Sequence, residues 1–475
     1  MRNTLTFLMI ICSSMLSAQQ TDSMQVLNFD VFYAFVLDNH PIVRQAKLLS
    51  DNAIQQLRLA RGSFDPKIEG NWNQKNFKDQ EYYNMANVGL KIPVWFPIDP
   101  KIGLMQNRGS YLNPEYYISD ATQNRQVYMG VSVPIGRGLI IDERRAMVKQ
   151  AKLFLQMTEA EQIKEINKIL LSAAKDYWQW YFTYQSYRLI EQSIDIAQDI
   201  YDRTITGYEL GVTAAIDTIQ ARIALQSRQI DFQQANIERV QAALQLSNHL
   251  WSTDGAPLEL TDNMIPEDSG MESLGEDILA QLLEMAQQNH PELVKLNLKN
   301  QSLNIDRKLA VENLKPRLDV DYSLLDQPIT PSGGSSDLAF TDNYKFGVSF
   351  AFPILLRKER AKLQQVNVKM EQNELEQVYQ ERRIINEIGA KYNEVVTTGQ
   401  MLEQQEQMVN NYNLILEAER LNLQNGESDL FKINVQFDKL ITSQTKLYKL
   451  RSQYQKSLAS LYWVAGVTNL GYLTQ

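Results

Sequence analysis

The sequence predicts an internally duplicated α+β membrane protein, in which each half contains a helix, a β-hairpin and a long helical hairpin. Three observations predict this class. The first is a repeat that spans half the chain. The second is a pair of short regions with strand-like alternation, and the third is a pair of long proline-free blocks with helical periodicity. Together they indicate that one architecture is built twice in a single chain.

The repeat is clearest at the tripeptide Asn-His-Pro, which occurs at 39–41 and again at 289–291. Each copy opens an amphipathic run, and its proline suits the first position of a helix. Two later prolines, Pro66 and Pro316, keep the same 250-residue offset with no gap. Because this period is too long for a solenoid repeat, it indicates duplication of a half-molecule.

Residues 1–18 predict a secretory signal peptide, with a basic residue, an apolar run and small residues up to Ala18. Cleavage there would remove Cys12, the only cysteine. The mature chain would then have no disulfide and no CxxC metal site, so packing or assembly must hold it together. The two repeats are predicted over 19–256 and 257–475.

Charge and motifs exclude several functional classes. The net charge of −9 argues against nucleic acid as a partner. After the leader, no stretch of eighteen consecutive apolar residues predicts a transmembrane helix. The sequence contains no HExxH, GxSxG, P-loop or Gly-rich dinucleotide motif, so we expect no enzyme, no cofactor and no metal.

The second repeat has the clearer β region, at about 317–353. Apolar and polar residues alternate over 318–324 and again over 344–352, around a polar turn at 328–337. This pattern predicts a hairpin with one apolar face and one polar or small face. Each strand is about as long as a tilted crossing of a bilayer requires.

The alternation assigns the side chains of this hairpin to two faces. In a membrane, the apolar face would meet lipid and the polar face would meet a lumen. The predicted lipid-facing residues are Val320, Tyr322, Phe346, Val348 and Phe350. The predicted lumen-facing residues are Asp319, Asp321 and Ser349. A half-buried sheet in a soluble protein would alternate in the same way, but the signal peptide and the position between long helices favour the membrane.

The first repeat has a less regular β region, at about 67–134. One strand is predicted over 67–73 and a return strand over 127–133. Some fifty residues rich in Pro, Asn and Tyr lie between them and predict an elaborated outer loop. Further alternation at 88–92 leaves an additional hairpin open there.

A sheet that spans a membrane must close, because unpaired edges in hydrocarbon cost several kcal/mol per group. The four strands predicted for this chain are too few, since about eight is the practical minimum for a barrel. Several chains must therefore share one barrel. Two copies would give eight strands, and three would give twelve, enough for a lumen.

The long helical blocks follow the β regions. Each contains 122 residues without proline, a residue that costs ~3 kcal/mol inside a helix. In the first block, the outgoing helix at about 142–206 would reach ~95 Å at 1.5 Å per residue. The aromatic cluster at 177–182 predicts interhelical core rather than a ligand platform.

A break at 207–211 precedes the returning helix of the first block, and a break near Gly426 precedes that of the second. Apolar residues then recur every seven positions, which predicts two helical hairpins with coiled-coil packing. In the first repeat these residues are Ile216, Ile223, Ile230, Ile237, Leu244 and Trp251. In the second they are Ile433, Leu440, Leu447, Tyr454 and Leu461.

The doubled order of these elements behind a signal peptide resembles the TolC family of outer-membrane efflux channels. The Asn-His-Pro tripeptides, the segments 130–146 and 347–361, and 208–212 with Asp217 carry the resemblance. It implies a homotrimer with a twelve-stranded β-barrel in the outer membrane and an α-helical barrel across the periplasm. It also implies two partners, a periplasmic adaptor protein and an inner-membrane transporter.

The resemblance places the helical turns at a periplasmic tip that closes the pore and meets the adaptor. The implied docking residues are Leu210, Gly211, Val212, Asn425, Gly426 and Glu427. Family members often have acidic residues six and nine positions after the second glycine, where this chain has Lys432 and Val435. In the first repeat, Asp217 lies six positions after Gly211 and corresponds to the first of these two acidic residues. Asp217 and Lys432 are therefore the candidates for a pore constriction that differs from the acidic version. The alternative for Asp217 is a solvated helix residue with no role in a pore.

The leading functional prediction is a passive export duct of a tripartite efflux or secretion system. The alternative is a periplasmic coiled-coil scaffold whose β regions are soluble docking hairpins. Release from membranes without detergent would favour the scaffold. The substrate and the class of pump are not encoded in any recognisable motif, because a wide wet lumen needs no specific binding site.

Overall fold

The computed structural model describes residues 25–268, 274–275, 277–326 and 343–467. The predicted signal peptide and the predicted turn at 328–337 lie outside these residues. The described chain divides into two compact units, each built from segments of both repeats. We call them the sheet unit (described residues within 41–169, 274–394 and 460–475) and the hairpin unit (within 1–40, 170–273 and 395–459).

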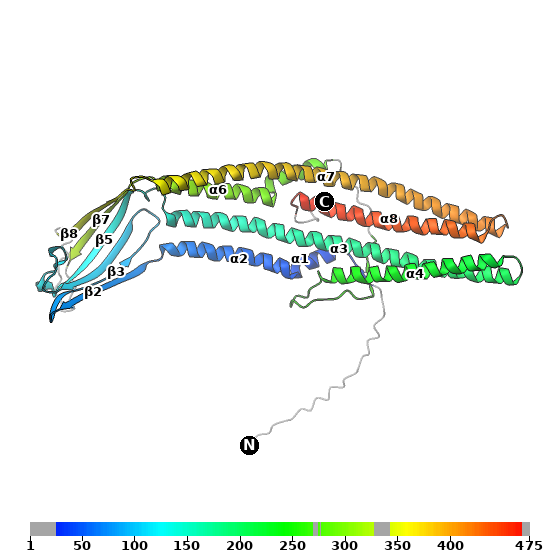
Figure 1. Cartoon of the computed structure of the whole chain (residues 1–475), viewed down its shortest axis with the longest axis horizontal. Helices are drawn as coiled ribbons and strands as arrows, with labels where there is room; N and C mark the ends of the chain where they lie inside the picture. The colour runs from blue at the N-terminus through cyan, green and yellow to red at the C-terminus, as the bar shows by residue number, and fades with distance from the viewer. Residues whose placement is uncertain (1–24, 269–273, 276, 327–342, 468–475) are drawn as a thin grey trace, which may run out of the picture. The chain divides into compact units, whose positions relative to one another are not determined.

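The sheet unit contains one antiparallel sheet in which the strand order follows the chain, β2-β3-β4-β5-β7-β8. Figure 1 labels β2 and β8 at its two edges. Its strands are β2 (Lys67–Phe77), β3 (Gln80–Lys91), β4 (Asp99–Arg108), β5 (Arg125–Gly136), β7 (Arg317–Asp326) and β8 (Tyr344–Ala351).

The prediction of four strands per chain is therefore wrong, because the described residues form six in this sheet. The two additional strands, β3 and β4, lie in the segment expected to be an outer loop. The open question of an extra hairpin is answered by this pair. Asparagines, glutamines and tyrosines interrupt the apolar alternation of 80–91 and obscure it in the sequence.

The helices of the sheet unit begin at the repeated tripeptides. Both α2 (Pro41–Arg61) and α6 (Pro291–Glu312) begin at the proline, as predicted. His290 caps α6, because its Nδ1 accepts a hydrogen bond from the backbone N–H of Glu292 at 3.2 Å. The short helix α5 (Ile278–Asn289) precedes it. The unit also holds the first parts of α3 (Glu143–Glu209) and α7 (Arg357–Gln424).

The hairpin unit confirms the two predicted helical hairpins. The later part of α3 turns into α4 (Ala215–Ser247), and the later part of α7 turns into α8 (Leu430–Val464). The unit also contains α1 (Phe29–Asn39). Strands β1 (Gln25–Leu27) and β6 (Met264–Pro266) pair in parallel. Among the described residues, none of the helices is long and apolar enough to cross a membrane.

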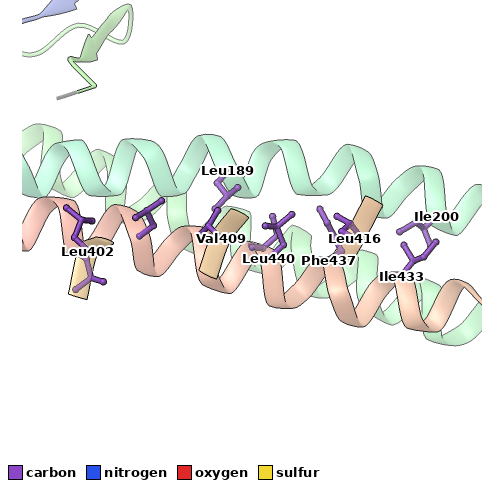
Figure 2. Close-up of a cluster of buried hydrophobic side chains, with 11 residues drawn as sticks. Leu189, Ile200, Leu402, Val409, Leu416, Ile433, Phe437 and Leu440 are labelled. Carbon is purple, nitrogen blue, oxygen red and sulfur yellow. The ribbon is translucent and has the colours of Figure 1, made fainter. Parts of the chain in front are cut away.

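The core of the hairpin unit lies between α3, α7 and α8, where Figure 2 shows a cluster of buried hydrophobic side chains. The heptad positions of the second repeat belong to this core, since Ile433, Leu440 and Leu447 are buried. The aromatic cluster of α3 is also core, as predicted. Tyr177 and Trp180 are buried, and the Tyr177 hydroxyl donates to the Leu27 carbonyl at 2.6 Å.

Five of the six predicted heptad positions of the first repeat do not pack inside the chain, contrary to the prediction of coiled-coil packing in both hairpins. The sixth, Trp251, lies beyond the end of α4, and its ring contacts the ring of His40. Ile216, Ile223, Ile230, Ile237 and Leu244 are between 51% and 66% exposed. The face of α4 that packs inside the chain instead carries Ala221, Leu225, Ala235, Ala242 and Leu246. The sequence pattern identified a helix surface correctly but could not show what covers it.

Candidate channel wall and tip

The register of the sheet separates its side chains into two faces, as the alternation predicted. Asp319 pairs with Ser349, while Val320 pairs with Val348 and Tyr322 pairs with Phe346. Paired residues share a face of a sheet. The predicted lumen residues therefore lie together on one face, which we call the polar face. The predicted lipid residues lie together on the other, the apolar face.

The apolar face extends across all six strands. Large side chains on it are exposed in the single chain, including those of edge strands β2 and β8. Its members include Ile68, Trp72, Val88, Ile102, Leu104, Met129, Phe346, Val348 and Phe350. An exposed apolar surface of this extent marks a contact with lipid or protein.

The polar face carries an ion pair that ties the additional hairpin to the second repeat. Lys101 of β4 reaches across β5 to Asp321 of β7, with Nζ at 2.8 Å from Oδ1. The residue of β5 next to Lys101 is Gly130, which has no side chain to obstruct this path. Asp321 was predicted to face a lumen, but the pairing with Lys101 could not be read from the sequence.

Glycines make room on the polar face for one tyrosine. The Tyr128 hydroxyl donates to Asn87 Oδ1 at 3.2 Å, so its side chain crosses β4 to reach β3. A Cβ added at Gly103 or at Gly89 would come within 2.5 Å of Tyr128 atoms. These two paired glycines therefore allow Tyr128 to lie along the sheet surface.

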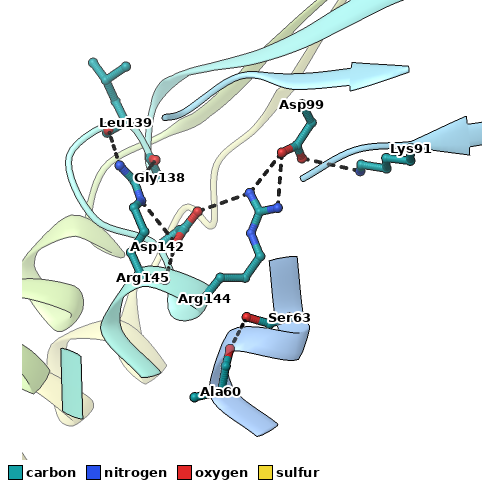
Figure 3. Close-up of polar contacts among 9 residues, drawn as sticks. All are labelled: Ala60, Ser63, Lys91, Asp99, Gly138, Leu139, Asp142, Arg144 and Arg145. Carbon is teal, nitrogen blue, oxygen red and sulfur yellow. Dashed lines mark hydrogen bonds and ion pairs between the residues drawn. The ribbon is translucent and has the colours of Figure 1, made fainter. Parts of the chain in front are cut away.

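Charged residues join the base of the sheet to the start of α3 (Figure 3). Arg144 donates two hydrogen bonds to Asp99 Oδ1, each at 3.1 Å, and one to Asp142 at 3.3 Å. Lys91 lies 3.5 Å from the same Asp99 carboxylate. Arg145, whose side chain is buried, donates to the Leu139 carbonyl at 3.2 Å and also to the Gly138 carbonyl. This cluster fixes the position of β4 on the helix.

The two helical turns in the hairpin unit have the same backbone structure. Gly211 has φ +75° and Gly426 has φ +78°, and both would place a Cβ in open space. In the first turn, Val212 N–H donates to Gly207 O at 2.8 Å and Gly211 N–H to Tyr208 O at 3.0 Å. The second turn repeats both bonds. This is the Schellman arrangement, in which glycine takes the left-handed position after a helix.

The predicted docking residues therefore lie in two exposed turns. Leu210 and Val212 are 74% and 79% exposed. Asn425 and Glu427 are also exposed. The structure contains no partner, so their contact with an adaptor stays a prediction.

The two residues predicted for a constriction each have a local partner. The Asp217 carboxylate accepts a hydrogen bond from the Ala214 backbone N–H at 3.1 Å, which caps α4. Lys432 Nζ lies 3.8 Å from the Asp429 carboxylate at the start of α8. These contacts give both residues a role at a helix end, and a role in a pore stays a prediction.

Comparison with protein families decides what this arrangement is. The sequence model of the outer membrane efflux protein family matches residues 33–250 and 282–467 of this chain. The chain belongs to that family. The two matched segments correspond to the two halves of the duplication, and they confirm the resemblance to TolC-type channels. The matched family is one of efflux ducts rather than of enzymes, and its members lie in the outer membrane and extend into the periplasm.

Solved structures agree with the fold of this efflux protein. It is similar to the CmeC outer membrane channel of Campylobacter jejuni, with TM-score 0.64, 12% identity and coverage of 92% and 85% of the two chains. It also resembles the outer membrane protein VceC of Vibrio cholerae, with TM-score 0.62, 12% identity and coverage of 92% of this chain and 95% of VceC. A third similar structure is the open state of the MtrE outer membrane channel of Neisseria gonorrhoeae. Its TM-score is 0.63 at 13% identity, with coverage of 92% of this chain and 88% of MtrE. A search of curated proteins found no match.

Proposed function

We propose that three copies of this efflux protein assemble into one continuous duct. The sheets would close a barrel in the outer membrane, and the helical hairpins would close a second barrel in the periplasm. The observation that carries the proposal is the exposed heptad row of α4, Ile216 to Leu244. Five large aliphatic residues at heptad spacing need a helical partner, and the described part of the chain offers them none.

A complementary row on α7 favours a second copy as that partner. Met401, Met408 and Ile415 also follow each other at intervals of seven, and they are 46%, 43% and 44% exposed. Apolar rows of one period can interlock as knobs into holes. Contact between α4 of one copy and α7 of the next would cover both rows around a ring.

The sheet supports the same assembly. Its edge strands β2 and β8 each have one paired neighbour among the described residues. Open edges are costly in hydrocarbon, so the sheet needs other copies to close it. The polar face would then line the lumen, with Asp319, Asp321 and Ser349 toward water.

The test is the oligomeric state after extraction in detergent. Light scattering, corrected for bound detergent, should give a trimer of the mature chain. Ile230→Asp places a charge in the middle of the α4 row and should reduce the trimer. Gln229→Asp adds the same charge at an exposed residue about 100° round the helix from Ile230 and should reduce it much less. A monodisperse monomer of the unmodified protein would contradict the proposal.

We also propose that the two exposed turns dock a periplasmic adaptor, which links the duct to an inner-membrane transporter. The exposed Leu210 and Val212 support this, since apolar side chains at the tip of a helical hairpin form a small contact surface. The alternative scaffold would have no membrane barrel. Membrane fractionation distinguishes the two, because the scaffold would leave the membrane in salt or carbonate without detergent.

A further inference from the structure

The hairpin formed by β3 and β4 adds two complete strands to the wall of the sheet. Strand β2 runs away from the end of α2, and β5 runs back to the start of α3. These two strands could have been joined directly by one outer loop. Instead the chain returns in β3, turns at 92–98 and leaves again in β4. The insertion therefore keeps every neighbouring pair antiparallel.

The additional hairpin has the construction of a membrane-spanning wall. Strands β3 and β4 contain 12 and 10 residues, compared with 11 in β2 and 12 in β5. The apolar face continues through them in register, with Val88 paired to Leu104 and Leu90 paired to Ile102. A loop lying on the outside of the membrane would have no reason to keep this alternation.

Contacts at the helix end of the sheet and on its polar face hold the β3–β4 hairpin in place. At the base, Trp95 packs against Phe64 with ring centroids 5.5 Å apart, and Asp99 is held by Arg144. On the polar face, the Lys101–Asp321 ion pair joins β4 to β7. Because these contacts involve both repeats and the start of α3, the hairpin is an integral part of the sheet.

We infer that three copies close an eighteen-stranded barrel, in which β2 of one copy pairs with β8 of the next. This inference rests on the trimer proposed above. Strand β8 runs back toward the helices and β2 runs away from them, so the new pairing is antiparallel like all the others. An even number of strands is also what bacterial outer-membrane barrels of one chain contain.

A barrel of eighteen strands would have a wider exit than the twelve-stranded barrel that the resemblance implies. With strands ~4.8 Å apart and tilted by about 40°, eighteen strands give a backbone radius of ~18 Å, against ~12 Å for twelve. The cross-section is then roughly twofold larger, in the range where barrels of 16–18 strands hold an aqueous channel. The duct would release bulky water-soluble cargo through this exit.

Disulfide cross-linking in outer membranes tests which strand closes the barrel. The mature chain is expected to lack cysteine, so engineered pairs have no background. Asn71→Cys on β2 is combined in turn with Lys345→Cys, Gly347→Cys or Ser349→Cys on β8. All four positions lie on the polar face, and three β8 positions cover the undetermined register.

The matched control replaces Asn71→Cys by Met105→Cys on the polar face of β4. After mild oxidation, at least one β2–β8 pair should form covalent trimers, and the β4–β8 pairs should not. Covalent trimers from β4–β8 pairs would mean that β2 and β3 lie outside a twelve-stranded barrel, which would overturn the inference. Failure of all β2–β8 pairs would overturn it as well.

Electron cryomicroscopy of the unmodified, detergent-solubilised protein provides a second measurement that needs no variant. Eighteen strands around the three-fold axis are expected. A trimer with twelve strands would overturn this inference and leave the proposed duct intact. A particle without three-fold symmetry would overturn the proposed assembly itself, so the two failures are distinguishable.

Discussion

Arginine substitution on the apolar face gives the sharpest test of where the lipid lies. Val348 is the fifth of eight residues in β8 and pairs with Val320, which pairs in turn with Val133 of β5. This row of valines crosses three strands, and each valine lies three residues from the end of its strand that meets the helices. Val348→Arg would place a guanidinium in that row, where a barrel buries it in hydrocarbon.

The expected magnitude follows from the depth of this position. Arginine on the lipid face costs ~2–4 kcal/mol at the bilayer midplane and ~0–1 kcal/mol near the interfaces, so a position between the two should cost ~1–3 kcal/mol. At ~1.4 kcal/mol for each factor of ten, the folding equilibrium constant of each copy should fall by roughly 5- to 140-fold. Three copies carry the change in a trimer, so the effect on assembly should be larger still.

Ser349→Arg is the matched control, since it adds the same charge at the next residue but on the polar face. Its neighbour across the strand is Asp319, a carboxylate that can accept the guanidinium. The readouts are the amount of trimer in outer membranes and the urea dependence of folding into phospholipid vesicles. If both variants assemble equally well, or Ser349→Arg is the worse, the apolar face does not meet lipid.

Three further predictions concern the turns and the histidines. Gly211→Gln should weaken adaptor binding in a pull-down while trimers form normally, since φ +75° costs other residues ~1–2 kcal/mol but the side chain meets open space; lost trimers would contradict this. In planar bilayers, Asp217→Ala should lower cation preference, and Lys432→Asp should raise it and introduce block by divalent cations. Unchanged selectivity in both variants would leave Asp217 with its capping role alone. Burial and the neighbouring His249 lower the pKa of His40 below its usual 6.5, so the unfolded chain binds the proton more readily. Stability should therefore be full above pH 6.5 and fall as the pH drops below it, and His40→Gln should flatten the urea midpoint between pH 7.5 and pH 5.5.

Features governed by local periodicity could be predicted from the sequence. Proline at the start of a helix, glycine at the two turns and strict alternation at Val320 and Val348 each follow from one residue's conformational preference or from one period. Such signals need no knowledge of neighbours. The duplicated α+β fold, both helical hairpins and the two faces of the second hairpin were therefore correctly predicted.

Features governed by distant partners could not be predicted in this way. The Lys101–Asp321 pair joins residues from different repeats, and the Arg144–Asp99 contact depends on where β4 begins. Strands β3 and β4 were left open rather than predicted, because Asn, Gln and Tyr are tolerated on a wet or interfacial face and hide the period. The α4 heptads were assigned to the wrong partner, since a seven-residue period describes a surface and not what covers it.

The exposed isoleucines of α4 have a consequence for how the protein is made. A single copy that has crossed the inner membrane but has not yet assembled would carry this aliphatic row together with two open sheet edges. Both features favour indiscriminate association between chains. Aggregation is therefore most favoured before assembly, and the yield of assembled protein should depend on how quickly copies associate with one another. Periplasmic chaperones that shield aliphatic helices and strand edges would act on this short-lived species, and a shortage of them would appear first as aggregated protein between the membranes.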